Sequence, residues 1–344
     1  MGPLGLAPFR PRFPWLGGDL QTLRDSIRPQ HLALPKLQLQ VQQQVLVPVQ
    51  GGALHGWLAR PSQAQDQDQA RALVLLVHGL GGSSDSVGVR RLAALLLQRG
   101  LAVLRLNLRG AGAGRALAAG SYAACCTSDL LPVLDRAREL AVGLPLFGVG
   151  LSLGGTVLLN ALLANPGGLD GLVALSAPLD LAASCDHMQR RRNRLYLQVV
   201  LRRLRQQVAA DPAGLSPAER QALAAVPAWS LAGFDGAITA PRWGFGSVEQ
   251  YYAAASPLPQ LLALPVLPPW LLLQAADDPW VPAAPAQALA AAWRGAVPGG
   301  GTVVLTPQGG HNGFHGAGDR ALGGLPASWS DQLTAAWLEQ QLGA

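Results

Sequence analysis

The hydrophobic and polar positions of this chain form short apolar runs that alternate with helical patterns. Residues 72–77 are apolar without interruption, and residues 101–110 are a second run with few polar positions. Continuous runs of this length are typical of strands that are covered on both faces. Between them, residues 88–100 repeat apolar positions at helical spacing and end on a glycine, which predicts a helix and its stop.

The same alternation continues towards the C-terminus. Residues 127–142 have the pattern of another helix. Further strands are predicted over residues 144–152, 171–178, 268–279 and 301–311. Buried strands that alternate with helices imply right-handed crossovers and a mostly parallel sheet with helices on both faces. The predicted fold class is therefore α/β.

The N-terminal part of the chain has a different pattern. Residues 1–36 predict an irregular arm, and residues 37–49 alternate like a strand with one solvent-exposed face. Residues 51–61 follow as a turn and a second strand, and residues 62–71 as a polar hairpin or loop. We predict one large domain over residues 37–344.

The alternation of strands and helices lapses between residues 177 and 268. Helical, arginine-rich and Pro/Gly-rich pieces replace it. We predict that residues from about 180 to 256 are a helical insertion, which lies as a cap or lid over one end of the sheet.

The composition bounds the class of protein. The chain has 344 residues, of which 49% are hydrophobic and 13% charged, which suits a large packed core and not a disordered chain. Arginine supplies nearly all of the positive charge behind the net charge of +6, because Lys36 is the only lysine. This pattern indicates a coding bias towards GC-rich codons, so nucleic acid is not an expected partner.

Residues 189–207 contain the densest group of arginines, spaced between apolar residues like an amphipathic helix with a basic face. A solvated face is the favoured interpretation. A weak attraction to anionic membrane surfaces or to acyl substrates stays open.

Three cysteines, Cys125, Cys126 and Cys185, have neither the number nor the spacing of a disulfide framework or a metal site. Free thiols in a reducing compartment are expected. The first residues lack the pattern of a secretory signal. The uncharged stretch 141–168 is broken by Gly and Pro, so we interpret it as core and not as a membrane span. A cytoplasmic protein is expected.

The stretch around Ser152 carries the first candidate chemistry. It has the form G-x-S-x-G, with Gly150 and Gly154 flanking the serine at a predicted junction of strand and helix. One interpretation is a tight turn between two buried elements. The other is a nucleophile elbow, where glycines are needed because side chains at these positions would collide with the neighbouring strand and helix.

The loop after the strand at residues 72–77 reads HGLGGSS. Acyl transfer places negative charge on a carbonyl oxygen, which rigid backbone N–H groups must stabilise. We predict that the N–H groups of Leu80 and Leu153 form this oxyanion hole. The alternative is that His78 and Gly79 are simply a turn.

A serine nucleophile needs a base and an acid that orients it. The expected chain order on this scaffold is Ser, acid, His. Asp277 and Asp278 end one predicted strand, and His311 and His315 follow the last one. We choose Asp278 and His311 and keep Asp277 as the competitor for the acid, while His315 is expected to pack or to face solvent.

These motifs together resemble the YheT-like group of α/β-hydrolases, which includes ABHD-type lipid esterases and phospholipases. The resemblance extends over roughly residues 9–340 and rests on FRPRFPWLGGDLQTL, HGLGGSSDS, NLRGAGAGR, GLSLGG, DDPWVP and GGHNGF. It implies the α/β-hydrolase fold and hydrolysis of carboxylic esters by a Ser-Asp-His triad without a metal or another cofactor. The chain departs from the group at Ala123, where histidine is usual, at Cys125 and Cys126, which put the size of the substrate pocket in doubt, and at Trp270, which we interpret as packing.

We therefore predict a serine hydrolase that cleaves short- to medium-chain acyl esters or lipids. A small-molecule or lipid ester is the expected partner, and no obligatory protein partner is evident. Two alternatives keep the same fold: an alcohol O-acyltransferase that uses the same triad, and a non-catalytic binding protein.

Overall fold

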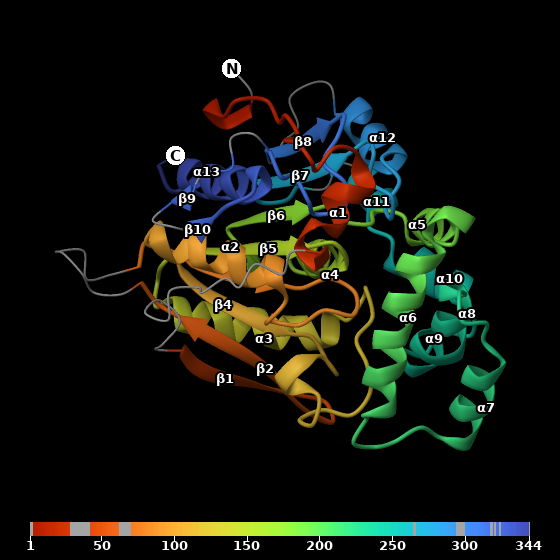
Figure 1. Cartoon of the computed structure of the whole chain (residues 1–344). Coiled ribbons are helices and arrows are strands. Elements are labelled where there is room, and N and C mark those ends of the chain that lie inside the picture. The colour runs from red at the N-terminus through yellow and green to blue at the C-terminus, as the bar shows by residue number, and fades with distance from the viewer. Residues whose placement is uncertain are drawn as a thin grey trace.

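A sheet of eight strands runs through the computed structural model of this chain (Figure 1). The structure describes residues 3–27, 42–61, 70–263, 266–293, 300–316, 319, 321–322 and 325–343. The order of the strands in the sheet is β1-β2-β4-β3-β5-β6-β7-β8. Their bounds are β1 Gln42–Val49, β2 Gly52–Ala59, β3 Leu73–Val77, β4 Ala102–Asn107, β5 Leu146–Leu151, β6 Gly171–Leu175, β7 Trp270–Ala275 and β8 Gly301–Thr306.

The strand pairing confirms the predicted fold class. β1 pairs antiparallel with β2 and β2 antiparallel with β4, whereas every other pair in this sheet is parallel. Each of the strands predicted from an apolar run is present. The predicted polar loop at residues 62–71 lies mostly outside the described residues, as do positions 37–41 of the first predicted strand.

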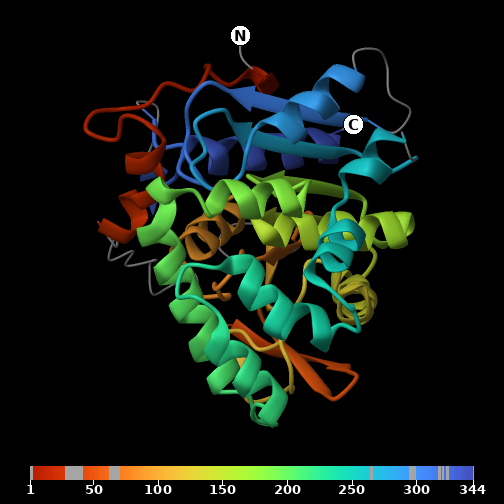
Figure 2. The ribbon, with the colours of Figure 1, turned by 90° about the vertical axis from the view of Figure 1, so that its right-hand side faces the viewer.

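Helices cover both faces of the sheet, as Figures 1 and 2 show. Strand β3 illustrates the burial of both faces. Its residues Leu73, Leu75 and Val77 pack into the core on one face, and Val74 and Leu76 pack into the core on the other. A strand buried on both faces has no wet side, so its sequence shows no alternation. The flanking helices are α2 Val87–Gln98 and α13 Trp329–Gly343 on one face, and α3 Thr127–Ala141, α4 Leu153–Ala164 and α12 Ala284–Ala292 on the other.

A group of helices follows β6 and precedes β7. Figure 1 places it beyond the ends at which β5 and β6 point, and Figure 2 shows it from its outer side. The helices are α5 Leu181–Met188, α6 Arg194–Ala209, α7 Pro217–Ala225, α8 Leu231–Phe234, a π-helical turn Asp235–Thr239, α9 Ala240–Arg242, α10 Val248–Ala255 and α11 Leu258–Leu262. Among the described residues no helix combines the length and the apolar character that crossing a membrane requires.

Two local expectations were wrong. The N-terminal arm is not irregular throughout, because α1 spans Gly18–Ile27. The arginine-rich helix begins at Arg194 and not near residue 189. The side-chain amide of Asn193 donates to the carbonyl oxygens of His187 (3.0 Å) and Pro279 (2.6 Å), and this fixes a separate turn before the helix.

Buried charges attach α1 to the rest of the fold. The guanidinium of Arg91 on α2 donates to Asp25 on α1 and, at 2.6 Å, to Asp331 on α13. Burial alone would lower the pKa of the Arg91 guanidinium, but the two carboxylates outweigh it and hold this pKa above its usual value. A buried charge with two partners is costly to leave unpaired, so this network fixes the arm against the domain.

Candidate active site

Ser152 lies at a sharp turn between β5 and α4. Its φ is 54° and its ψ is −127°, and residues other than glycine rarely adopt a backbone conformation with a positive φ. The flanking glycines are required by space. A Cβ at Gly150 would stand 2.3 Å from the backbone nitrogen of Gly155, and one at Gly154 would stand 2.5 Å from the carbonyl oxygens of Val77 and His78. The collisions predicted with helix and strand are therefore present.

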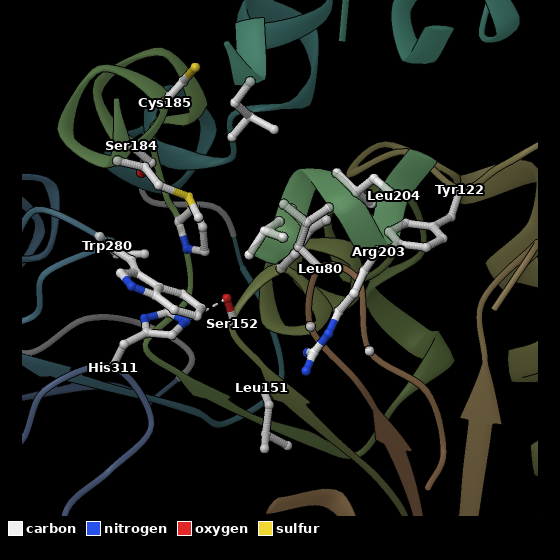
Figure 3. Close-up of a pocket in the computed structure, with 18 of the residues that line it drawn as sticks. Leu80, Tyr122, Leu151, Ser152, Ser184, Cys185, Arg203, Leu204, Trp280 and His311 are labelled. Carbon is white, nitrogen blue, oxygen red and sulfur yellow. Dashed lines mark hydrogen bonds between the residues drawn. The ribbon is translucent and has the colours of Figure 1, made fainter. Parts of the chain in front are cut away.

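Two hydrogen bonds join the three predicted side chains. The hydroxyl of Ser152 donates to Nε2 of His311 at 2.9 Å, and Nδ1–H of His311 donates to Oδ2 of Asp278 at 2.9 Å. His311 and Asp278 are 6% and 4% exposed, so water competes little for these bonds. In Figure 3 the Ser152 oxygen points at the imidazole, and the ring of Trp280 lies beside it, 4.6 Å from the imidazole centre.

The structure separates the roles of the two neighbouring aspartates. Asp278 is held by the backbone N–H groups of Trp280 (2.8 Å) and Val281 (3.0 Å) and by the amide of Gln274 (3.2 Å). Asp277 does not reach the imidazole and instead accepts the N–H of Gly310 at 2.9 Å. Burial raises the pKa of Asp277. The carboxylate that contacts His311 is therefore the predicted one, Asp278.

The N-terminal helix α1 holds the loop of His311. The hydroxyl of Thr22 accepts the backbone N–H of His311 at 2.8 Å and donates to Gly18 O at 2.7 Å. Gly310 has a φ of 59°, and a Cβ there would stand 2.4 Å from Gly18 O. His315 is buried, lies 3.4 Å from Asp25, and is not part of the hydrogen-bonded chain.

The two predicted oxyanion groups come from different elements: Leu80 lies in the loop after β3, and Leu153 directly follows Ser152 at the start of α4. No described residue accepts a hydrogen bond from the N–H of Leu80 or from the N–H of Leu153, so both are available to a ligand. His78 fixes this loop, because its Nδ1–H donates to Gly79 O (2.8 Å) and its Nε2 accepts the N–H of Leu108 (3.2 Å). Burial lowers the pKa of His78 to about 4, which keeps the ring neutral at neutral pH.

A cavity of about 290 Å³ opens at Ser152. Its walls come from the loop after β3 and from the helices between β6 and β7, as Figure 3 shows. The apolar part of the wall includes Leu80, Leu181, Met188, Leu204, Leu231 and Phe234. Mostly apolar walls with a few polar groups are typical of small-molecule sites.

Several residues of the cavity were missed by the sequence analysis. Cys185 lines it, whereas Cys125 and Cys126, which were expected near the pocket, do not. All three thiols are free, as predicted. Arg203 of α6 also lines the cavity, although a purely solvated basic face was favoured for this helix. The departure at Trp270 is packing, as predicted, because this ring is 1% exposed and lies 4.8 Å from the ring of Trp293.

Asp235 is a carboxyl group in the cavity wall that no sequence motif singled out. It accepts the hydroxyl of Thr239 at 2.7 Å and the hydroxyl of Tyr252 at 2.8 Å. Burial raises its pKa to about 6. The available signal was an acidic residue inside an apolar helical stretch, FDGAIT, where a charge needs partners.

Comparison with known proteins decides the family. The sequence profile of the Hydrolase_4 family, described as "Serine aminopeptidase, S33", matches residues 68–315. The chain belongs to this family. The match spans the loop after β3, the turn at Ser152 and the loop of His311, and it confirms that the chain is a serine hydrolase with the α/β-hydrolase fold.

Relatives of this Hydrolase_4 member confirm the resemblance to the YheT-like group. YheT of Escherichia coli is 29% identical over 84% of this chain and 81% of its own length. Phospholipase ABHD3 of Mus musculus is 26% identical over 80% of this chain and 67% of its own length. A solved structure of Est1E from Butyrivibrio proteoclasticus with bound ferulic acid is 16% identical, covers 87% of this chain and 100% of its own, and has a TM-score of 0.55. That likeness supports the fold alone.

Proposed function

We propose that this serine hydrolase cleaves carboxylic esters that carry an uncharged, apolar acyl group. The observation that carries the proposal is the chain of two 2.9 Å hydrogen bonds from Ser152 through His311 to Asp278 at the edge of an apolar cavity. A hydroxyl alone is a weak nucleophile, and an adjacent oriented base removes this obstacle.

The proposed reaction has two steps. The Ser152 oxygen attacks the ester carbonyl while Nε2 of His311 takes the hydroxyl proton, and Asp278 stabilises the imidazolium that forms. The N–H groups of Leu80 and Leu153 stabilise the oxyanion. Collapse of the tetrahedral intermediate breaks the bond to the alcohol, which leaves with the proton from His311. Water then attacks the acyl-enzyme by the same route and releases the acid.

The substrate class follows from the walls of the cavity. Leu181, Met188 and Phe234 give an acyl chain apolar surface to contact, whereas the charged Arg203 lies where the cavity meets the solvent. The relative named phospholipase ABHD3 supports a lipid or fatty-acyl ester. Short- to medium-chain acyl esters and lipid esters are therefore the proposed substrates.

A panel of p-nitrophenyl esters with increasing acyl length tests this proposal. Each added methylene should raise kcat/KM by about fourfold while the chain still buries new surface, because one buried CH₂ contributes about 0.8 kcal/mol. A preference for the acetyl ester, or faster turnover of amino-acid p-nitroanilides, would contradict it. Product analysis with added ethanol should give the free acid as the main product, whereas a predominant ethyl ester would favour the acyltransferase alternative.

A further inference from the structure

Helix α6 exposes large aliphatic side chains on the side that faces away from the protein. Leu195 is 77% exposed and Val199 is 53% exposed. Arg202 continues the same stripe, because residues spaced by four and then three positions share one helical face. The opposite face of α6 already packs into the core through Leu197, Val200, Leu201, Leu204 and Val208. Packing within the fold therefore does not explain the outer apolar residues.

Helix α1 adds a further exposed apolar residue near the start of α6. Leu20 of α1 is 40% exposed. Asp19, in the same turn as Leu20, accepts hydrogen bonds from Arg192 (2.7 Å) and from the hydroxyl of Tyr196 (3.1 Å). Figures 1 and 2 both show α1 beside the start of α6.

We define the docking face as Leu20 of α1 and Leu195 and Val199 of α6. It borders the mouth of the cavity, because the same two helices line that cavity: α1 contributes Thr22 and Asp25, and α6 contributes Arg203. Arg203 is solvent-exposed, so the cavity meets the surface here. Figure 3 shows Arg203 on the side of Ser152 opposite to His311.

The α6 side of the docking face is strongly positive. Residues 189–209 contain seven arginines and no acidic residue. No hydrogen bond or ion pair joins Arg202 or Arg203 to any described residue, which leaves both guanidinium groups available to an anion. Grouped exposed aliphatic side chains beside arginines fit an anionic lipid surface. A nucleic acid would use the arginines but would gain nothing from the aliphatic side chains.

We propose that the docking face binds the surface of anionic lipid membranes, with the mouth of the cavity turned towards the lipid. Leu195 and Val199 enter the region between head groups, and the arginines of α6 contact the lipid phosphates. This orientation would let an acyl ester pass from the lipid layer to Ser152. The binding itself does not depend on the proposed ester chemistry.

Co-sedimentation with lipid vesicles tests the proposal. The Ser152→Ala protein is used, so that the lipids stay intact, with vesicles of phosphatidylcholine alone and of phosphatidylcholine mixed with phosphatidylglycerol. Binding to the mixed vesicles is expected. The variant Leu195→Gln/Val199→Gln should bind at least about tenfold more weakly, because the lost insertion removes two buried aliphatic side chains. Arg202→Gln should weaken binding to the anionic vesicles.

Val266 provides the matched control. It is 76% exposed, close to the value of Leu195. It precedes β7 and so lies at the N-terminal ends of the parallel strands, whereas the active site lies at their C-terminal ends. Val266→Gln should bind vesicles like the parent protein. In the Ser152-containing background, the Leu195→Gln/Val199→Gln variant should turn over a water-soluble ester at the parent rate, which shows an intact fold.

Three results would overturn the proposal. The first is that the parent protein does not sediment with anionic vesicles. The second is that Val266→Gln loses as much binding as the Leu195→Gln/Val199→Gln variant. The third is binding of duplex DNA without binding of vesicles, which would assign the arginines to nucleic acid.

Discussion

Replacing Ser152 with alanine should lower kcat for an activated acyl ester by about 10⁶. The reason is that the variant has no hydroxyl at 2.9 Å from Nε2 of His311, so no oxygen of the protein is activated to attack the ester. Steady-state release of p-nitrophenol from the parent and variant proteins measures the effect.

The fold should survive this substitution. Alanine removes one hydroxyl and keeps the Cβ, so the positive φ at position 152 is no more strained than with serine. Urea unfolding should therefore give a free energy of unfolding within about 1 kcal/mol of the parent value. Turnover within tenfold of the parent by a folded Ser152→Ala protein would remove the serine from the mechanism.

Asp278→Asn should lower kcat by about 10⁴. An amide in place of Oδ2 presents a donor to Nδ1 of His311, and the imidazole is then driven towards the tautomer that cannot accept the serine proton. The hydrogen bonds from the N–H groups of Trp280 and Val281 remain available to the retained oxygen, so the local backbone should keep its position.

Asp277→Asn is the matched control for that prediction. It removes the same charge at the adjacent position, but Asp277 contacts Gly310 and not the imidazole. Because the amide oxygen can still accept this N–H, turnover should stay within about tenfold of the parent value. Equal losses in both variants would mean that the negative charge near the site matters and the contact with His311 does not.

The local patterns of the sequence were sufficient for much of the fold and for selecting the three side chains that the two hydrogen bonds join. Strands such as β3 are apolar on both faces, so a run without polar residues identifies them. The serine turn was predictable because Gly150 and Gly154 have no room for a Cβ. Ser152, Asp278 and His311 each follow a strand, so they were expected together at the C-terminal ends of the parallel strands.

Contacts between segments far apart in the sequence were not predictable in this way. Thr22 accepts the backbone N–H of His311, which is 289 positions away in the sequence. Because residues 1–36 were predicted to be irregular, no role was predicted for Thr22. Arg203 and Cys185 reach the cavity because of how their helices pack over the sheet. The pattern of residues in those helices shows which face is apolar, but it does not show what that face covers.

The choice between Asp277 and Asp278 has the same physical origin. Both follow β7, and their side chains leave the backbone in different directions. Only the geometry of the loop after the strand decides which one meets the imidazole. The two neighbouring N–H groups on Oδ1 of Asp278 fix that geometry.

The most direct test of the central claim is labelling with a fluorophosphonate probe, followed by mapping of the modified peptide. The claim is that His311 activates Ser152. The expected result is one label, on Ser152, that is formed rapidly by the parent protein and lost in the His311→Ala variant. Labelling of another residue, or labelling of Ser152 at an unchanged rate without His311, would contradict the account.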